Sequence, residues 1–132
     1  MKKLPTLGKL KKIADGLWST LIRQRDKVCL ICGGMDNLHA HHVIIRKRLS
    51  NKTRWSPCNG IALCYRCHMI KLHRDSDKDF LDVYMEKVNE KIPQEIQEEL
   101  RNEAKEPCSD PSRADLEALI NKLTILLQGD SV

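Results

Sequence analysis

Two Cys-x-x-Cys pairs, Cys29/Cys32 and Cys64/Cys67, are the residues of this 132-residue chain whose spacing most directly predicts chemistry. Each pair can present two thiolates to one tetrahedral ion, and four thiolates form the closed ligand set of a structural zinc site. A single pair could be a coincidence or a redox motif, but two pairs favour zinc. We therefore predict one structural Zn²⁺ bound by all four cysteines, with the other two cysteines as bystanders.

All five histidines lie inside the same stretch, residues 29–74. His41 and His42 are adjacent, and His68 directly follows the second cysteine pair. A neutral imidazole can deprotonate water near neutral pH, and it can also bind a divalent ion. A set of histidines can therefore supply both a general base and a metal site. Since four thiolates already close a zinc site, the histidines indicate a second purpose beyond structure.

The charge distribution favours a partner rich in negative charge. Residues 37–74 carry eight Lys or Arg and no Asp or Glu, whereas residues 75–110 carry twelve acids against five bases. A solvated surface usually mixes its signs, so the acid-free window most simply predicts binding to nucleic acid. No apolar run is long enough to span a membrane, and the start of the chain lacks the apolar region of a signal peptide. We expect a soluble, cytoplasmic protein with no membrane partner.

The elements that must position these residues form a short α+β core. We expect a zinc knuckle over 29–34, a strand over 38–45, a basic loop, a second strand over 60–63 and a helix from 64 or 65 to about 74. This order, with the second cysteine pair at the start of the helix, is a treble-clef arrangement. A metal staple is also expected because the chain has few aromatic residues for a core.

Helices are predicted on both sides of this core, so the chain is expected to be mostly helical. Apolar residues recur at three- and four-residue steps over 7–25, and we expect this basic helix either to pack on the core or to contact DNA. Helices are also predicted over 78–91, with Asp77 as the cap, from Pro93 to before Pro107, and over 114–128. The last is leucine-rich and is expected to pack on its own domain, with a homodimer or partner contact as the alternative. We therefore expect three parts: an N-terminal basic helix in residues 1–28, the core with the four-cysteine zinc site in residues 29–76, and a C-terminal helical extension in residues 77–132.

Over residues 29–74 the chain resembles the zinc-containing branch of the HNH endonucleases, the His-Me finger or ββα-metal superfamily. The motifs that carry the resemblance are Cys29-x-x-Cys32, His41-His42-Val, Asn59, and Cys64-x-x-Cys67-His68. Asn59 lies five residues before Cys64, as in the family pattern, and the phrase Asn-Gly-Ile-Ala-Leu-Cys is similar to small HNH proteins of phages and prophages. The resemblance covers about a third of the chain and implies a treble-clef-like, zinc-stabilised ββα-metal core flanked by helices.

The resemblance implies a role for each polar residue of the motif. His42 would be the general base, and His41 and His68 would bind a catalytic divalent metal, Mg²⁺ or Mn²⁺, with Ni²⁺ or Zn²⁺ as alternatives. Asn59 would tie the loop so that His42 is held in line. Because neighbours on a strand point to opposite sides, strand twist must bring the rings of His41 and His42 to one cleft.

Two further histidines have open roles. His73 stands five residues after His68, whereas family members commonly carry a histidine at four, and on an ideal α-helix a step of five turns the side chain by about 140° instead of about 40°. His73 is expected to be a third metal ligand if the helix distorts, and otherwise a phosphate contact or a surface residue. His39 shares the strand face of His41, and we expect a structural or DNA-contacting role.

The predicted function is that of a metal-dependent HNH endonuclease that cuts DNA, most simply double-stranded DNA. The resemblance to phage and prophage proteins implies that a phage or prophage encodes the enzyme and that it acts in the cytoplasm of the host cell. The alternative is a zinc-stabilised DNA-binding module without catalysis. Phosphates would be bound by five basic residues between His42 and Asn59, and these would supply affinity and not sequence choice. They are Arg46, Lys47, Arg48, Lys52 and Arg54.

Overall fold

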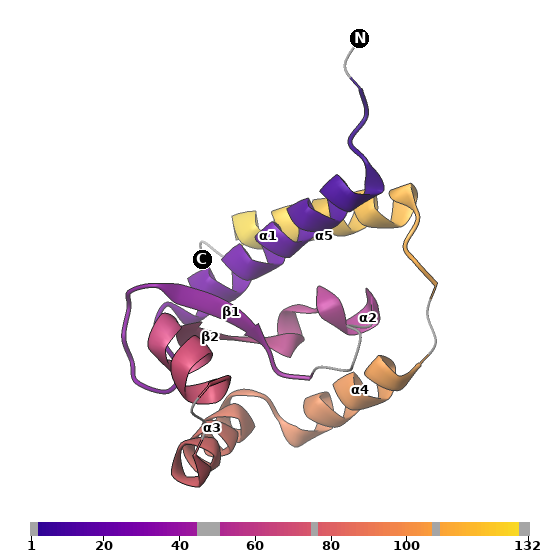
Figure 1. Cartoon of the computed structure of the whole chain (residues 1–132). Helices are drawn as coiled ribbons and strands as arrows, with labels where there is room; N and C mark the ends of the chain where they lie inside the picture. Colours follow the sequence, from indigo (N-terminus) through magenta and orange to yellow (C-terminus); the bar gives the residue numbers. More distant parts are fainter. Residues whose placement is uncertain (1–2, 45–50, 75–76, 107–108, 130–132) are drawn as a thin grey trace.

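A computed structural model of the protein describes residues 3–44, 51–74, 77–106 and 109–129 (Figure 1). In these parts the chain is a mostly helical α+β fold with five α-helices and one two-stranded antiparallel sheet. The elements are α1 (Leu7–Asp26), β1 (Leu38–His42), α2 (Asn51–Arg54), the 3₁₀ turn η1 (Pro57–Asn59), β2 (Gly60–Cys64), the π-helix η2 (Arg66–Leu72), α3 (Lys78–Lys91), α4 (Gln94–Lys105) and α5 (Arg113–Gly129).

Helix α1 forms where the three- and four-residue apolar steps predict it. Its first turn is closed by Thr6, whose hydroxyl accepts a hydrogen bond from the backbone N–H of Lys9 at 3.1 Å. The helix ends at Asp26, and the capping residue Lys27 adopts a left-handed conformation with φ 66°. Its buried face consists of Leu10, Ala14, Trp18, Leu21 and Ile22.

Strands β1 and β2 pair in a register that places His42 opposite Gly60 and His41 opposite Ile61. The strand was expected to continue beyond His42, but β1 ends there, and Val43 and Ile44 lie outside it. The next residues leave the ladder for Asn59: the backbone N–H of Ile44 donates to the Asn59 side-chain oxygen at 2.8 Å. Residue 45 lies outside the described residues.

The sheet separates two apolar clusters. Side chains on one face, including Ile61 and Leu63, pack with Tyr84 and Val88 of α3; we call this the α3 cluster. The other face packs against α1 and, through it, α5; this is the α1 cluster, with Leu10, Ala14, Trp18, Leu21, Ile22, Trp55, Leu116 and Leu123 as its buried members. Figure 1 shows α1 and α5 side by side, so the two ends of the described chain close over the same face of the sheet.

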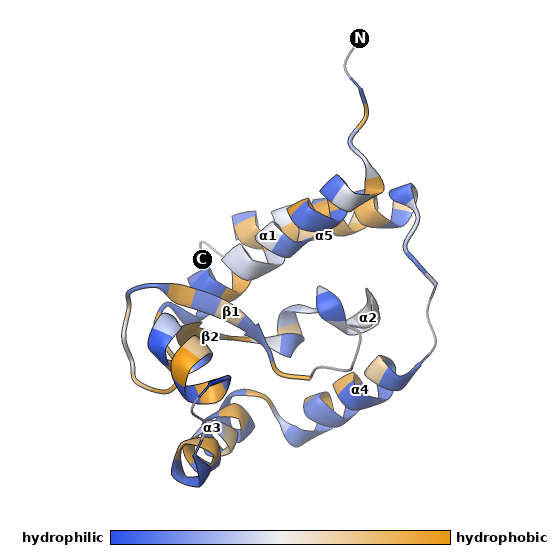
Figure 2. Ribbon diagram, in the orientation of Figure 1, coloured by the Kyte–Doolittle hydropathy of each residue, from blue (hydrophilic) through white to orange (hydrophobic). Residues whose placement is uncertain are grey.

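The C-terminal helices begin and end close to the predicted positions. Asp77 caps α3, accepting from the backbone N–H of Phe80 at 2.7 Å. Five residues of α3 recur at the three- and four-residue steps typical of an apolar face, namely Phe80, Leu81, Tyr84, Met85 and Val88. Of these, Tyr84 and Val88 are buried, but Leu81 and Met85 are exposed. Helix α4 is largely hydrophilic (Figure 2). No helix in the described ranges is both long and apolar enough to cross a membrane.

The segment predicted as one basic loop contains additional structure. Asn51–Arg54 form the short helix α2, and Pro57–Asn59 form η1, whose first turn is capped by the hydroxyl of Ser56. Periodicity could not reveal either element, because each is about one turn long and is fixed by contacts with distant residues. One such contact is the pair of hydrogen bonds from the Arg54 guanidinium to the Asp15 carboxylate of α1.

Candidate metal centres and the His42 site

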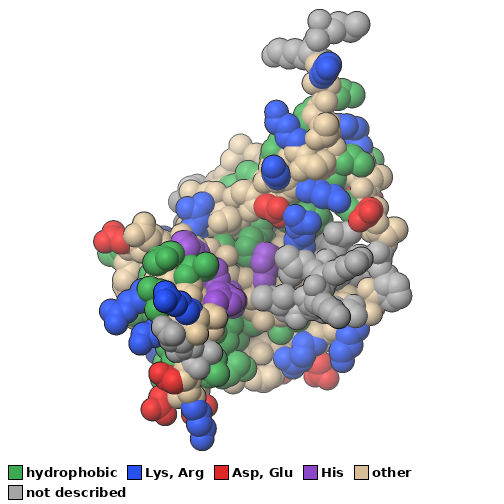
Figure 3. All heavy atoms as spheres, viewed as in Figure 1, with side chains coloured by type: hydrophobic (Ala, Val, Ile, Leu, Met, Phe, Trp, Pro, Cys, Tyr) green, Lys and Arg blue, Asp and Glu red, His purple; other side chains and the backbone are tan. Residues whose placement is uncertain are grey.

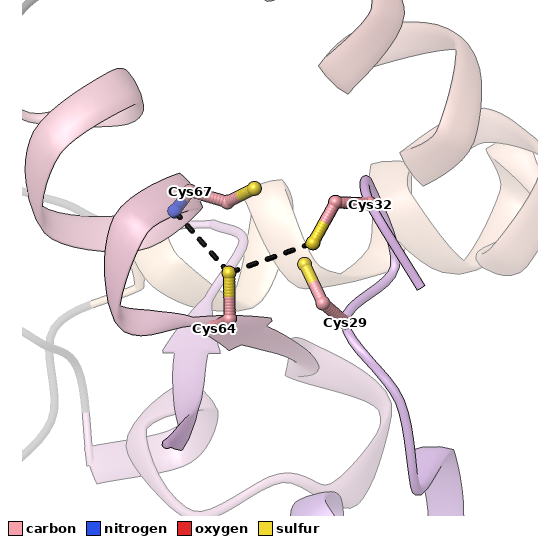
Figure 4. Close-up of side chains that lie close together, drawn as sticks. All are labelled: Cys29, Cys32, Cys64 and Cys67. Carbon is pink, nitrogen blue, oxygen red and sulfur yellow. Dashed lines mark hydrogen bonds between the residues drawn. The ribbon is translucent and has the colours of Figure 1, made fainter. Parts of the chain in front are cut away.

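Four cysteine side chains converge between the end of α1 and the start of η2 (Figure 4). Cys29 and Cys32 come from the turn after α1, Cys64 ends β2, and Cys67 lies in the first turn of η2. All four sulfur atoms lie within 4.8 Å of one another, and the sulfurs of Cys32 and Cys64 are 3.6 Å apart. A tetrahedral ion with Zn–S bonds of about 2.3 Å separates its sulfurs by about 3.8 Å, so the cluster could hold a metal and is compatible with structural zinc.

Backbone N–H groups around the cluster favour the thiolate form of Cys29. Burial opposes ionisation of Cys29, but backbone N–H groups, of which that of Cys32 contributes most, lower its pKa to about 7. Gly34 donates its N–H to the sulfur of Cys32 at 3.4 Å, and a Cβ at this glycine would stand 3.3 Å from the same sulfur. Burial, and then the neighbouring thiols, raise the pKa of Cys67.

A second cluster of ligands forms from His41, His68 and His73. One ring nitrogen of each lies within 4.8 Å of the others. His41 is buried, His68 is half-buried and His73 is exposed, so the cluster runs from the interior to the surface. Ring centroids are 4.8 Å apart for His68 and His73 and 5.0 Å apart for His41 and His68. This spacing is compact enough for one metal ion to be held by all three.

The π-helical geometry of η2 explains how His73 reaches this cluster. The sequence predicted a helix here, and on an ideal α-helix residues five apart point well away from each other. A π-helix closes its hydrogen bonds between residues five apart, which places residue i+5 above residue i. His73 directly follows Arg66–Leu72, and its ring meets that of His68 edge-on, with 70° between the ring planes. The helix is therefore distorted from α-helical geometry, as it must be for His73 to serve as a third metal ligand.

The buried rings of the cluster are held neutral. Burial, with the neighbouring His68 as the next cause, lowers the pKa of His41 to about 3. Burial and the nearby His73 likewise lower the pKa of His68 to about 4. A neutral imidazole keeps a lone pair, so both rings are in the form that binds metal near neutral pH.

His42 lies against different elements from His41. Its ring stacks on the indole of Trp18 in α1, with 4.0 Å between centroids, and its Nε2 is 2.7 Å from the backbone oxygen of Arg54. A carbonyl only accepts, so Nε2 carries the hydrogen and a neutral ring has its lone pair on Nδ1. Burial lowers the pKa of His42 below the usual 6.5. Histidine side chains nevertheless gather on one face of the molecule in Figure 3.

Asn59 is completely buried and joins three segments around His42. Its side-chain oxygen accepts from the N–H of Ile44, and its side-chain nitrogen donates to the carbonyls of Ile44 and Thr53, both at 3.1 Å. Thr53 precedes the residue whose carbonyl binds His42. Asn59 therefore fixes the end of β1 and α2 relative to each other.

The predicted phosphate-binding residues are only partly described. Arg46, Lys47 and Arg48 lie outside the described residues, as does the side chain of Lys52. The Arg54 guanidinium pairs with the Asp15 carboxylate at 2.7 Å and lies over the ring of Trp55. These contacts hold α2 against α1, which is a structural role and not the predicted phosphate contact. Figure 3 shows further Lys and Arg side chains over α1, above the histidines.

Two residues that contact the histidines were not singled out as site residues from the sequence. Trp18 stacks on His42, and the hydroxyl of Tyr84 lies 3.0 Å from Nε2 of His41. Each recurs at four-residue steps with other apolar residues of its helix, Trp18 with Ala14 and Ile22 and Tyr84 with Phe80 and Val88, a spacing that indicates burial. Nothing in helical periodicity identifies which polar group a buried aromatic ring meets across a sheet.

Comparison of this chain with protein-family models, curated proteins and solved structures finds no match. Any assignment of function therefore rests on the residues and their geometry.

Proposed function

We propose that this protein is a metal-dependent endonuclease of the HNH kind that hydrolyses DNA phosphodiester bonds, with a treble-clef-like ββα-metal core. The observation that carries the proposal is the presence of two separate ligand clusters, one of four thiolates and one of three imidazoles. A purely structural zinc module needs only the thiolates. The imidazole cluster, and His42 on the other side of the sheet, are the surplus that hydrolysis would use.

The second cluster suits a divalent cation. His41, His68 and His73 would hold it, and three protein ligands leave coordination positions for substrate oxygen or water. When bound, such an ion would stabilise negative charge on the phosphorane and on the leaving oxygen. The cluster has no carboxylate among the described residues, and an all-imidazole donor set favours Zn²⁺ or Ni²⁺ over Mg²⁺ or Mn²⁺.

His42 would be the general base. The Arg54 carbonyl accepts the Nε2 hydrogen, so the proton of an attacking water would be taken up at Nδ1. The lowered pKa keeps this nitrogen unprotonated near neutral pH. Asn59 would act through position alone, by joining the end of β1 to the turn that carries the Arg54 carbonyl.

DNA is the substrate that the charge distribution supports best. The acid-free window of residues 37–74 contains all three histidines of the imidazole cluster and one of the two cysteine pairs, and the lysines of α1 extend the basic surface. Replacing Arg46, Lys47 and Arg48 together should reduce the slope of log affinity against log salt, by roughly one unit for each phosphate that the protein no longer neutralises.

A plasmid cleavage series tests the proposal. The wild type should cut DNA with at least one of Mg²⁺, Mn²⁺, Ni²⁺ or Zn²⁺, and chelator should stop it. His42→Ala should keep its zinc and its DNA affinity and lose about two to four orders of magnitude in rate, since a general base contributes that much. Cleavage by His42→Ala at the wild-type rate would refute the base assignment. A wild type that binds DNA but cuts it with none of these ions would instead be a binding module.

A further inference from the structure

His41 is the buried member of the histidine cluster, and one of its two nitrogens is already occupied. Its Nε2 lies 3.0 Å from the hydroxyl oxygen of Tyr84. Tyr84 comes from α3, is only 8% exposed and belongs to the α3 cluster, so its ring is held by packing. A histidine that binds a metal through one nitrogen usually gives the hydrogen on its other nitrogen to such a partner.

We propose that Tyr84 is a positioning residue for the second metal centre: its oxygen accepts the Nε2 hydrogen of His41, which leaves Nδ1 as the nitrogen that binds the ion. The inference rests on the proposed function, because it concerns the metal site on which that function depends. The hydrogen bond between His41 and Tyr84 could run in either direction, because a phenol hydroxyl can donate as well as accept. Donation by Tyr84 to Nε2 would put the ring hydrogen on Nδ1 and block metal binding there, so only acceptance by Tyr84 is compatible with metal at Nδ1.

His68 has an equivalent partner. Its Nδ1 lies 3.0 Å from Nδ1 of His39, the residue that shares the strand face of His41. With Nδ1 engaged in this bond, His68 keeps Nε2 for a metal. His39 is therefore assigned the role of hydrogen-bond partner to the metal ligand His68, and its own ring packs edge-on against Tyr65. Two ligands of the cluster thus have their free nitrogen selected by a neighbour that is not itself in the cluster.

The origin of Tyr84 gives the inference a structural consequence. The HNH-like motif ends at residue 74, whereas Tyr84 lies in the middle of α3, 43 residues after His41. The C-terminal helices therefore do more than cover the core, because α3 supplies a hydrogen-bond partner to a metal ligand. Loss of the single oxygen in Tyr84→Phe would leave the buried Nε2 hydrogen of His41 without that partner.

Metal titration of the full-length protein tests the role of Tyr84. Protein with its cysteine site filled by zinc is titrated with Co²⁺, and visible absorption reports binding to nitrogen ligands. Tyr84→Phe should bind this second ion about 10- to 100-fold more weakly, the usual effect of removing an outer partner of a metal ligand. The matched control is Tyr65→Phe, which removes the same atom from an exposed ring and should leave the affinity unchanged.

A second measurement does not depend on the variant. Long-range ¹H–¹⁵N spectra of the zinc-loaded wild type should give the shifts of a hydrogen on Nε2 of His41 and on Nδ1 of His68. Equal Co²⁺ affinity in Tyr84→Phe and the wild type, or a hydrogen on Nδ1 of His41, would overturn the inference and leave the proposed function standing. A wild type that binds no ion beyond the cysteine zinc would overturn the metal-dependent function itself.

Discussion

The imidazole of His42 lies flat on the indole of Trp18, with 4.0 Å between the ring centroids and 6° between the ring planes. The stack forms because Gly60, the cross-strand neighbour of His42, has no side chain to separate α1 from the sheet. Trp18 is itself fixed by burial and by the bond from its indole N–H to the Ser56 carbonyl at 2.7 Å. The proposed base is therefore held by the N-terminal helix as well as by the HNH-like motif.

The stack predicts the pH dependence of cleavage. His42 must be neutral to accept a proton, so activity should rise with pH through its pKa. Burial holds that pKa below the usual 6.5, so the midpoint of the rise should also fall below 6.5. Trp18→Leu should admit water to the ring, raise the pKa and shift the midpoint upward. A pH–rate profile of each protein measures this, with zinc content as the check on folding. An unchanged midpoint would mean that another group controls the profile.

The close approach at Gly60 predicts a loss of stability on substitution. A Cβ at this position would stand 2.7 Å from the Trp18 ring and 2.8 Å from the Ile22 side chain. Gly60→Ala should therefore destabilise the fold by about 1 to 3 kcal/mol, the usual cost of overpacking a core. Urea unfolding of the zinc-loaded protein measures the change.

Gly16→Ala is the control for this prediction. Gly16 lies in the interior of α1, and a Cβ added there would have no atom within 4 Å, so alanine meets no obstacle. The same substitution should stabilise the protein by about 0.5 to 1 kcal/mol through helix propensity. If both variants shift the unfolding midpoint in the same direction, packing against Gly60 is not what decides the outcome.

Much of the helical framework could be predicted from the sequence because it depends on local signals. The apolar steps of α1, the Asp77 cap of α3 and the proline before α4 each act within one or two turns. The convergence of the four cysteines could also be predicted, because metal ligands constrain where distant segments must meet.

What could not be predicted depends on contacts between distant segments. The end of β1 at His42 is set by Asn59, fifteen residues after Ile44, through its bonds to that residue. The π-helical register of η2 has no pattern that distinguishes it from an α-helix of the same composition. The contacts of His42 and His41 with aromatic rings of α1 and α3 likewise depend on how the helices pack on the sheet.

The cysteine cluster predicts that zinc and folding are coupled. Cys32→Ser removes one of four ligands, and because the free energy of metal binding contributes to folding, the variant should lose its zinc and unfold at a lower temperature. Elemental analysis of protein purified without added metal should give about one zinc per chain for the wild type. Cys58→Ser is the matched control, since Cys58 is exposed and lies outside the cluster. A fully folded Cys32→Ser protein without zinc would contradict a structural role for the metal.

The register of η2 predicts which position after His68 can supply a third ligand. In an α-helix that position would be residue 72, four residues on, whereas in the π-helix it is His73. His73→Leu should weaken binding of the second metal ion by removing one of three ligands. The double variant Leu72→His/His73→Leu places a histidine at the α-helical spacing instead. The two variants differ only at position 72, so their comparison tests whether a histidine at that position can reach the ion.

We expect the double variant to bind the second ion no more tightly than His73→Leu. Leu72 packs against the α3 cluster, so in the π-helical register a histidine at 72 points into that packing. Co²⁺ titration of both variants measures the affinity, and the content of cysteine-bound zinc and the melting temperature reveal any loss of fold caused by the polar ring. Recovery of wild-type affinity in the double variant would mean that η2 returns to α-helical register when metal binds. Continued weak binding, with the cysteine zinc retained, would mean that the π-helix is the geometry in which the third histidine serves the metal.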